Sequence, residues 1–82
     1  MDFYCYILYS QRLDRYYIGQ TNDLENRINQ HNSGSNRFTS KGIPWIIVHK
    51  EKYNSRLEAV QRENEIKRKK SRKYIEFLIA SS

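Results

Sequence analysis

Two phenols, one guanidinium, one imidazole and one carboxylate stand at positions of this 82-residue sequence where packing alone does not explain them. They belong to Tyr6, Tyr17, Arg27, His31 and Glu63. Phenol and imidazole groups can exchange protons, and a guanidinium binds anions. A lone carboxylate can pair with a cation or bind a metal ion. Brought together, these groups would suit acid–base chemistry on an anionic substrate.

Glu63 interrupts what is otherwise an apolar helix face. At about 100° per residue, a helix over residues 56–69 places Glu63 among Ala59, Val60 and Ile66. An ionised carboxylate on a core-facing stripe is costly unless it is paired or bound to a metal ion. Glu63 therefore either has a function or lies at the edge of this face and pairs with a nearby Arg or Lys.

The two tyrosines share a face of the expected hairpin in one particular register. If Leu8 pairs with Tyr17, then Tyr6 lies opposite Gly19 and points to the same side as Tyr17. Gly19 would then leave an open space beside both hydroxyls. The sequence does not fix this register, so the alternative is that both rings are half-buried sheet residues.

Arg27 and His31 stand four residues apart on the next expected helix. This spacing stacks them on one face, beside a stripe formed by Leu24 and Ile28. Taken singly, each is also compatible with an ordinary surface residue.

Hydrophobic patterning predicts strands at residues 3–9, 15–19 and 45–51. The third strand is almost continuously apolar, as a strand covered on both faces would be. Residues 32–42 between the first helix and the third strand lack periodicity and are rich in Ser, Asn and Gly, so we expect a loop. With three helices, the order is β-β-α-β-α-α. This order indicates an α+β domain with a three-stranded antiparallel sheet flanked by helices.

Each helix is expected to begin at a polar residue that caps its free amides. The expected caps are Asn22 with Glu25, Ser55 with Glu58, and Ser71. The second helix should span 56–69, and the third should turn an apolar face made by Tyr74, Ile75, Leu78 and Ile79 toward the core.

The net charge of +6 is concentrated in one segment. Residues 67–73, KRKKSRK, hold six basic residues and no acid, so the other 75 residues hold nine of each sign. A local basic patch indicates a polyanionic partner, although a solvated helix end would give the same pattern. The loop at 32–42 adds Arg37 and Lys41.

The length predicts a single domain over residues 1–82. No apolar run approaches the roughly 20 residues of a membrane span, and no signal-peptide pattern is present. One cysteine excludes an internal disulfide, and Cys5 with two histidines makes no zinc-ligand spacing. We therefore expect a cytoplasmic protein with no membrane partner. Its oligomeric state is not predicted.

These residues resemble the motifs of the GIY-YIG nuclease superfamily. The resemblance is to its small stand-alone bacterial members and to the N-terminal nuclease domain of the bacterial excision-repair endonuclease. The YIG element is intact at residues 17–19, and the GIY element appears in degenerate form as YCY at residues 4–6. There Cys5 replaces an aliphatic residue and Tyr6 keeps the tyrosine.

The remaining motifs follow in the family's order. Arg27 and His31 match the family's arginine and histidine in DLENRINQH, and Glu63 matches its metal-binding glutamate in EAVQRENEIK. TSKGIPW at residues 39–45 matches the loop that precedes the third strand in the small members. An asparagine found downstream of the glutamate in larger members has no match here.

The resemblance implies a metal-dependent endonuclease that hydrolyses phosphodiester bonds of DNA, with structure-selective or weakly sequence-specific cutting and a role such as DNA repair. Glu63 would hold one Mg²⁺ or Mn²⁺, Arg27 would neutralise charge on the phosphate, and Tyr6 would take a proton from the attacking water. Tyr17 and His31 would relay that proton. The residues expected to contact the substrate are Gly19, Arg37, Lys41, Lys67, Lys69, Lys70 and Arg72.

Two other classes of function compete with this interpretation. One is a nucleic-acid-binding module that does not cleave, and the other is a small basic protein of a ribonucleoprotein. Simple binding does not need a carboxylate that repels phosphate, so Glu63 favours the nuclease.

Overall fold

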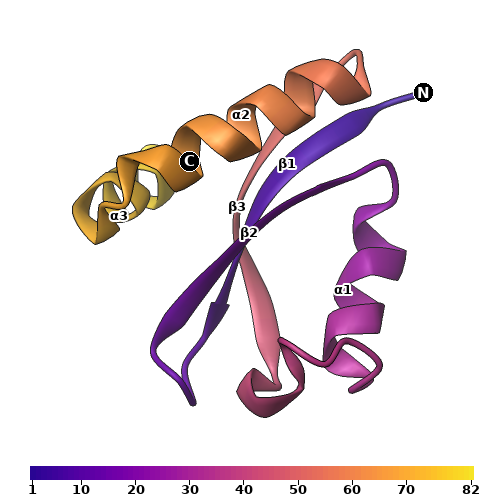
Figure 1. Cartoon of the computed structure of the whole chain (residues 1–82), viewed down its shortest axis with the longest axis vertical. Coiled ribbons are helices and arrows are strands. Elements are labelled where there is room, and N and C mark those ends of the chain that lie inside the picture. The colour runs from indigo at the N-terminus through magenta and orange to yellow at the C-terminus, as the bar shows by residue number, and fades with distance from the viewer.

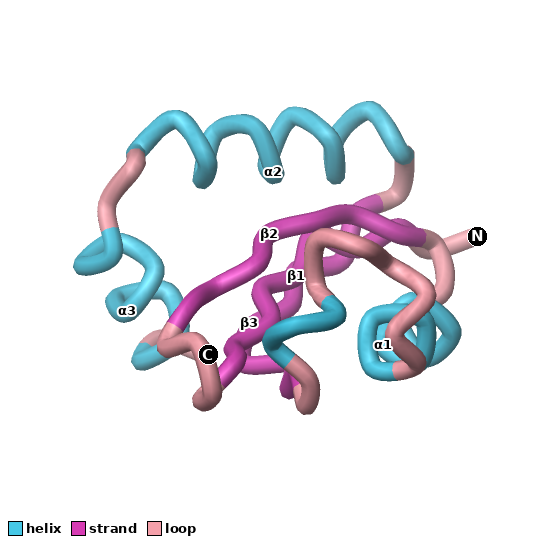
Figure 2. Tube along the Cα trace, turned by 60° about the horizontal axis from the view of Figure 1, so that its bottom comes forward, coloured by secondary structure: helices cyan, strands magenta, loops and turns pink.

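The computed structural model describes residues 1–82 as a three-stranded antiparallel sheet between two helical layers (Figures 1 and 2). The strands follow the spatial order β2-β1-β3 and are β1 (Phe3–Ser10), β2 (Arg15–Thr21) and β3 (Trp45–Tyr53). The helices are α1 (Leu24–Asn32), a short 3₁₀ helix η1 (Ser40–Gly42), α2 (Arg56–Lys69) and α3 (Arg72–Ala80). The predicted α+β class and element order are confirmed.

Alternating side chains of β1 supply the cores of both layers. Cys5 and Ile7 pack under α2 and α3, against Ile66 and Leu78. Tyr6 and Leu8 point to the opposite face, where α1 covers the sheet, and pack with Trp45, Tyr17, Leu24 and Ile28. The central strand is therefore buried on both faces, and Figure 2 shows α2 and α1 on opposite sides of the sheet.

The prediction that the third strand is covered on both faces is wrong. β3 pairs only with β1, so it forms an edge of the sheet, and Ile46 is 57% exposed. The apolar run reflects β propensity at an edge rather than cover on two faces. The pairing with β1 also contains an irregularity between Ile7 and Leu8.

Helix starts agree with the capping predictions in two of three cases. Ser55 accepts a hydrogen bond from the amide of Glu58 at 3.2 Å, and Ser71 accepts one from that of Tyr74 at 3.1 Å. The first prediction is wrong because Asp23, rather than Asn22, caps α1 and accepts from the amide of Asn26. The reason is local: the Thr21 hydroxyl accepts from the Asp23 amide at 3.1 Å, a turn that delays the helix by one residue.

None of the helices combines the length and the apolar character that a membrane-spanning helix needs.

Candidate active site

The register of the hairpin is the one that places both tyrosines on one face. Leu8 pairs with Tyr17 and Tyr6 with Gly19. The expected open space beside Gly19 is absent because the Tyr6 ring fills it. A Cβ atom at Gly19 would lie 2.5 Å from the Tyr6 hydroxyl oxygen. Glycine is thus required here so that the buried Tyr6 ring can cross the neighbouring strand.

A buried chain of polar contacts runs from β1 through α1 to the following loop. The Tyr6 hydroxyl lies 3.3 Å from Nε2 of His31, and Nδ1 of His31 lies 3.0 Å from Oγ1 of Thr39. All three side chains are at most 1% exposed. His31 is therefore no surface histidine. Thr39 lies within the loop motif of the sequence, but nothing in its spacing predicted the contact with His31.

The loop holds Thr39 firmly. Its carbonyl oxygen accepts from Nε1 of Trp45 at 2.6 Å, and its Oγ1 lies 3.5 Å from the carbonyl oxygen of Asn36, to which it can donate. If Oγ1 donates to Asn36, it accepts from Nδ1–H of His31. Nε2 is then left unprotonated and can accept the hydroxyl proton of Tyr6.

Tyr17 completes a cluster of three rings. Its ring centroid lies 4.7 Å from that of His31 in an edge-on arrangement, and 6.5 Å from that of Tyr6. Tyr17 is half-buried, whereas the Tyr6 ring is enclosed. Of the two phenols, Tyr17 is the one that faces solvent.

Burial raises the pKa of Tyr6, the positive charge of Arg27 lowers it, and Tyr17 and the Glu63 carboxylate add smaller increases. Burial also lowers the pKa of His31, and the positive charge of Arg27 adds to this effect. At neutral pH the site therefore holds a protonated phenol next to a neutral imidazole. The charge of Arg27 thus acts on both Tyr6 and His31.

Glu63 lies on α2, one turn from the buried residues Ala59 and Ile66. Its side chain is 17% exposed and pairs with the ammonium group of Lys67 at 2.6 Å. Its negative charge acts on Tyr6 and also on Cys5, on the other face of β1. Glu63 therefore has the partially buried position predicted from the helix face, together with the cationic partner of the alternative interpretation.

A divalent cation fits this donor set only with help from solvent and substrate. No group of three or more His, Cys, Asp or Glu side chains is placed to hold a metal ion. Mg²⁺ is commonly bound by one or two carboxylates while it keeps several waters, and phosphate oxygens complete its shell. Glu63 alone is compatible with such a site.

Some cations of the basic segment 67–73 contact an acid or an aromatic ring in the structure, and others do not. Arg72 pairs with Asp14 at 2.6 Å and lies 5.0 Å above the Tyr16 ring centroid, so it joins α3 to the hairpin. Lys69 lies 5.2 Å from the ring centroid of Tyr74. An exposed groove along α2 is lined by polar and charged residues alone, Gln61, Asn64, Lys67, Arg68 and Lys70. Lys67 is paired with Glu63, so Arg68 and Lys70 are the cations of this groove that remain available for an anion.

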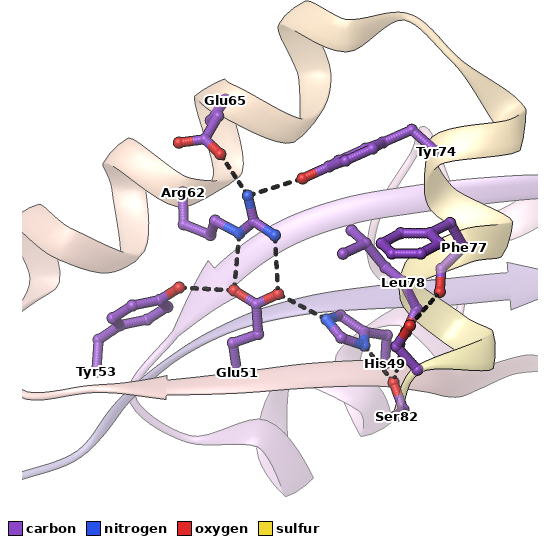
Figure 3. A network of polar contacts seen from close by, with 10 residues as sticks. His49, Glu51, Tyr53, Arg62, Glu65, Tyr74, Phe77, Leu78 and Ser82 are labelled. Atoms are coloured by element: carbon purple, nitrogen blue, oxygen red, sulfur yellow. Dashed lines mark hydrogen bonds and ion pairs between the residues drawn. The ribbon is translucent and has the colours of Figure 1, made fainter.

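Sequence reasoning missed a second polar network, on the α2 and α3 face of the sheet (Figure 3). At its centre, Glu51 of β3 accepts from Nε and Nη2 of Arg62 at 2.8 and 3.2 Å. His49 and Tyr53 bond the same carboxylate at 2.7 and 2.6 Å. Arg62 directly precedes Glu63, so this clamp fixes the rotation of α2 and with it the direction of Glu63. This network becomes visible only when β3 is placed in the sheet under α2.

The network predicts acid-sensitive stability. Burial raises the pKa of Glu51, but hydrogen bonds from Arg62, His49 and Tyr53 outweigh it and lower the pKa to about 2 from 4.5. Because the folded-state pKa is depressed, this stabilisation is present above pH 4.5 and is lost as the pH falls toward 2. The difference corresponds to roughly 3 kcal/mol.

We expect Glu51→Gln to lower the free energy of unfolding at pH 7 by about 3 kcal/mol and to flatten its dependence on pH below 4.5. Urea denaturation at a series of pH values measures both effects. Glu25→Gln, on the exposed side of α1, is the matched control. A pH profile shared by wild type and Glu51→Gln would contradict the clamp.

Three comparisons with known proteins bear on this site. A profile of the GIY-YIG catalytic domain matches residues 2–75. A UPF0213 protein of Natronomonas pharaonis is 38% identical over 67 residues, covering 80% of this chain and 78% of the relative. A UPF0213 protein of Streptococcus pneumoniae is 37% identical over 76 residues, covering 92% and 76%. The solution NMR structure of a UPF0213 protein from Bacillus halodurans matches with a TM-score of 0.63 and 32% identity, over 100% of this chain and 86% of that one.

Proposed function

This chain belongs to the GIY-YIG family of nuclease catalytic domains, and from that premise we propose that it is a metal-dependent endonuclease acting on DNA. One observation carries the proposal. The Tyr6 hydroxyl and Nε2 of His31 lie 3.3 Å apart in the buried part of the site, and the charges of one guanidinium, Arg27, and one carboxylate, Glu63, both act on Tyr6. A purely structural core has no need to gather these four groups.

The phenol and the imidazole together can accept the proton of an attacking water. The raised pKa of Tyr6 disfavours a free phenolate, so Tyr6 takes a proton only as it passes its own to His31. The lowered pKa of His31 keeps Nε2 free for that proton at neutral pH. The proton thus moves from water to the Tyr6 oxygen while the phenolic proton moves to Nε2, and no charge remains on Tyr6.

Arg27 and Glu63 act on the phosphate from different sides. The planar guanidinium of Arg27 can bind two phosphate oxygens and offset the charge that develops on them. Glu63 is the residue that would hold Mg²⁺ or Mn²⁺. When bound, the cation supplies Lewis-acid stabilisation of the phosphate and the leaving oxygen.

A panel of labelled substrates tests this proposal. We expect cleavage of DNA flaps, forks, junctions or duplexes with Mg²⁺ or Mn²⁺ and none with EDTA, with RNA as the comparison. Binding to the same DNA without cleavage under every metal condition would overturn the endonuclease assignment.

The ion pair between Lys67 and Glu63 favours a second candidate, a nucleic-acid-binding module without cleavage. In this arrangement the ammonium group lies 2.6 Å from the carboxylate that the metal would need. The two candidates differ in whether a metal ion can displace Lys67.

Lys67→Met is expected to raise the affinity of the protein for Mn²⁺ because it removes the cation that competes for Glu63. The pair is half-exposed at its lysine end, so the gain should be about two- to fivefold. Free Mn²⁺ measured by electron paramagnetic resonance during a titration gives the affinity directly. Lys69→Met removes an equal charge from the same helix two residues further on and is the control, and equal affinities for both variants would contradict competition at Glu63.

A further inference from the structure

Phe38 is a large apolar side chain left in solvent. It lies in the loop between α1 and η1, and 89% of its surface is exposed. Hydrophobic residues of this size in a small domain are usually packed, as Phe3 and Tyr16 are here in part. An exposed phenyl ring contributes little to this fold and is free to contact a ligand.

The backbone around Phe38 is fixed by hydrogen bonds. Asn36 accepts from the amide of Phe38 through its side chain at 2.9 Å, and through its carbonyl oxygen from the amides of Thr39 and Ser40 at 3.2 and 3.0 Å. The Ser40 hydroxyl donates to the carbonyl oxygen of Arg37 at 3.2 Å. The ring is therefore presented on a pre-organised turn, which lowers the entropy cost of binding through it.

Thr39, the residue after Phe38, joins this turn to the candidate active site. Thr39 points inward and contacts His31 at 3.0 Å, while Phe38 points outward. Consecutive Cα atoms are about 3.8 Å apart, so the exposed ring begins one residue away from the group that contacts the proton-accepting imidazole. Thr39 and His31 are themselves buried, so a ligand stacked on Phe38 would lie next to the wall of the candidate active site.

The charges around the ring select the class of ligand. Arg37 and Lys41 flank Phe38 and are both exposed, and residues 32–50 contain no acid. An aromatic side chain between cations is the combination that binds single-stranded nucleic acid, with bases stacked on the ring and phosphates held by the cations. A protein partner with an apolar pocket would not need the two cations.

We propose that Phe38 stacks on an unpaired or displaced base next to the scissile phosphate, so that the preferred substrate is DNA with single-stranded character at the cut. This inference rests on the proposed nuclease function for the place of the cut. Bases inside a duplex have both faces covered by their neighbours, and inserting a ring between them costs unstacking free energy, so Phe38 stacks most readily where a base is already unpaired or displaced.

Binding in EDTA tests the stacking separately from cleavage. Fluorescence anisotropy is measured with one labelled oligonucleotide as a single strand, in a perfect duplex and in a duplex with a single-stranded flap. Phe38→Ala is expected to weaken binding to the single strand and to the flap by about 5- to 100-fold, while duplex binding changes less than about twofold. Phe38→Trp should restore binding, and Phe38→Leu should not.

Phe77 provides a matched control because it is 64% exposed on α3 and is not part of the site. Phe77→Ala should bind all three DNAs as wild type does. Equal affinity of Phe38→Ala and wild type for the flap would overturn the inference, as would full affinity in Phe38→Leu or an equal loss on all three DNAs. An altered sedimentation coefficient of Phe38→Ala with unchanged DNA binding would overturn it in favour of a protein contact.

The inference and the proposed function fail in different ways. If no DNA is cleaved with Mg²⁺ or Mn²⁺ but Phe38→Ala still loses single-strand binding, the stacking stands and the nuclease assignment falls. If DNA is cleaved and Phe38→Ala shows no preference change, the nuclease assignment stands and the stacking falls.

Discussion

Glu63→Gln is expected to reduce metal-dependent DNA cleavage on the order of 10³-fold or more while leaving the fold and DNA binding nearly intact. Gln has the same shape as Glu but carries no charge, so it cannot hold a divalent cation against solvent. The side chain is only 17% exposed beside buried Ala59 and Ile66, and an amide is easier to bury there than a carboxylate. Loss of the carboxylate also frees Lys67, so DNA binding in EDTA should not weaken.

Single-turnover cleavage with saturating protein and Mg²⁺, DNA anisotropy in EDTA and thermal melting measure the three parts of this prediction. Glu25→Gln is a suitable control because Glu25 is exposed on α1 and forms no ion pair, so the variant removes one negative charge without touching the Arg62 clamp. Wild-type turnover in Glu63→Gln would remove Glu63 from the mechanism, whatever the state of Lys67.

The parts of the fold that sequence predicted are those set by local rules. The spacing of Tyr74, Ile75 and Leu78 predicted the apolar face of α3, and all three side chains pack in the core under this helix. The capping serine Ser55 placed the start of α2 correctly because its partner stands at a fixed spacing.

The predictions that failed concern features that depend on residues distant in the sequence. The apolar run of β3 did not reveal that it lies at a sheet edge, because edge and centre differ only in which other strands are present. The space at Gly19 was misjudged for a similar reason. Glycine marks a close approach, but the sequence does not say which side chain makes it.

The same distinction between local and distant neighbours holds for the candidate site. Residue types and helical spacing brought Arg27, His31 and Glu63 to notice, but spacing cannot tell a buried helix face from an exposed one. His31 is buried because the loop after α1 folds back and supplies Thr39, a contact made across eight residues. The clamp between Glu51 and Arg62 joins a strand to a helix and has no signature in either segment alone.

The hydroxyl of Tyr6 offers the sharpest test of the proposed proton path. It is the only part of this side chain that Phe lacks, so Tyr6→Phe keeps the ring over Gly19 and removes the contact with His31. We expect the cleavage rate to fall by about 10²–10⁴-fold, the usual effect of losing a positioned proton acceptor. Nε2 of His31 loses its partner, so the free energy of unfolding should fall by about 1 kcal/mol.

Tyr17→Phe is the matched control for this change. The Tyr17 ring packs edge-on against His31 and survives in Phe, so its rate should fall by less than about tenfold if the hydroxyl only orients water or substrate. Similar rate losses in both variants would mean that the two phenols share the role.

The pH dependence distinguishes a relay through Tyr6 from a structural hydroxyl. His31 must be neutral to accept the proton, and burial and Arg27 lower its pKa below the usual 6.5, so the wild-type rate should fall only at pH values below 6.5. In Tyr6→Phe the imidazole no longer receives a proton from the reacting water, so the remaining cleavage rate should no longer fall at low pH. If Tyr6→Phe cleaves more slowly but its rate still falls at low pH, then His31 accepts the proton by another route and Tyr6 only positions the imidazole. A variant as fast as wild type would leave Tyr6 as a core residue, and the proton acceptor would then have to be sought at Tyr17, the phenol that faces solvent.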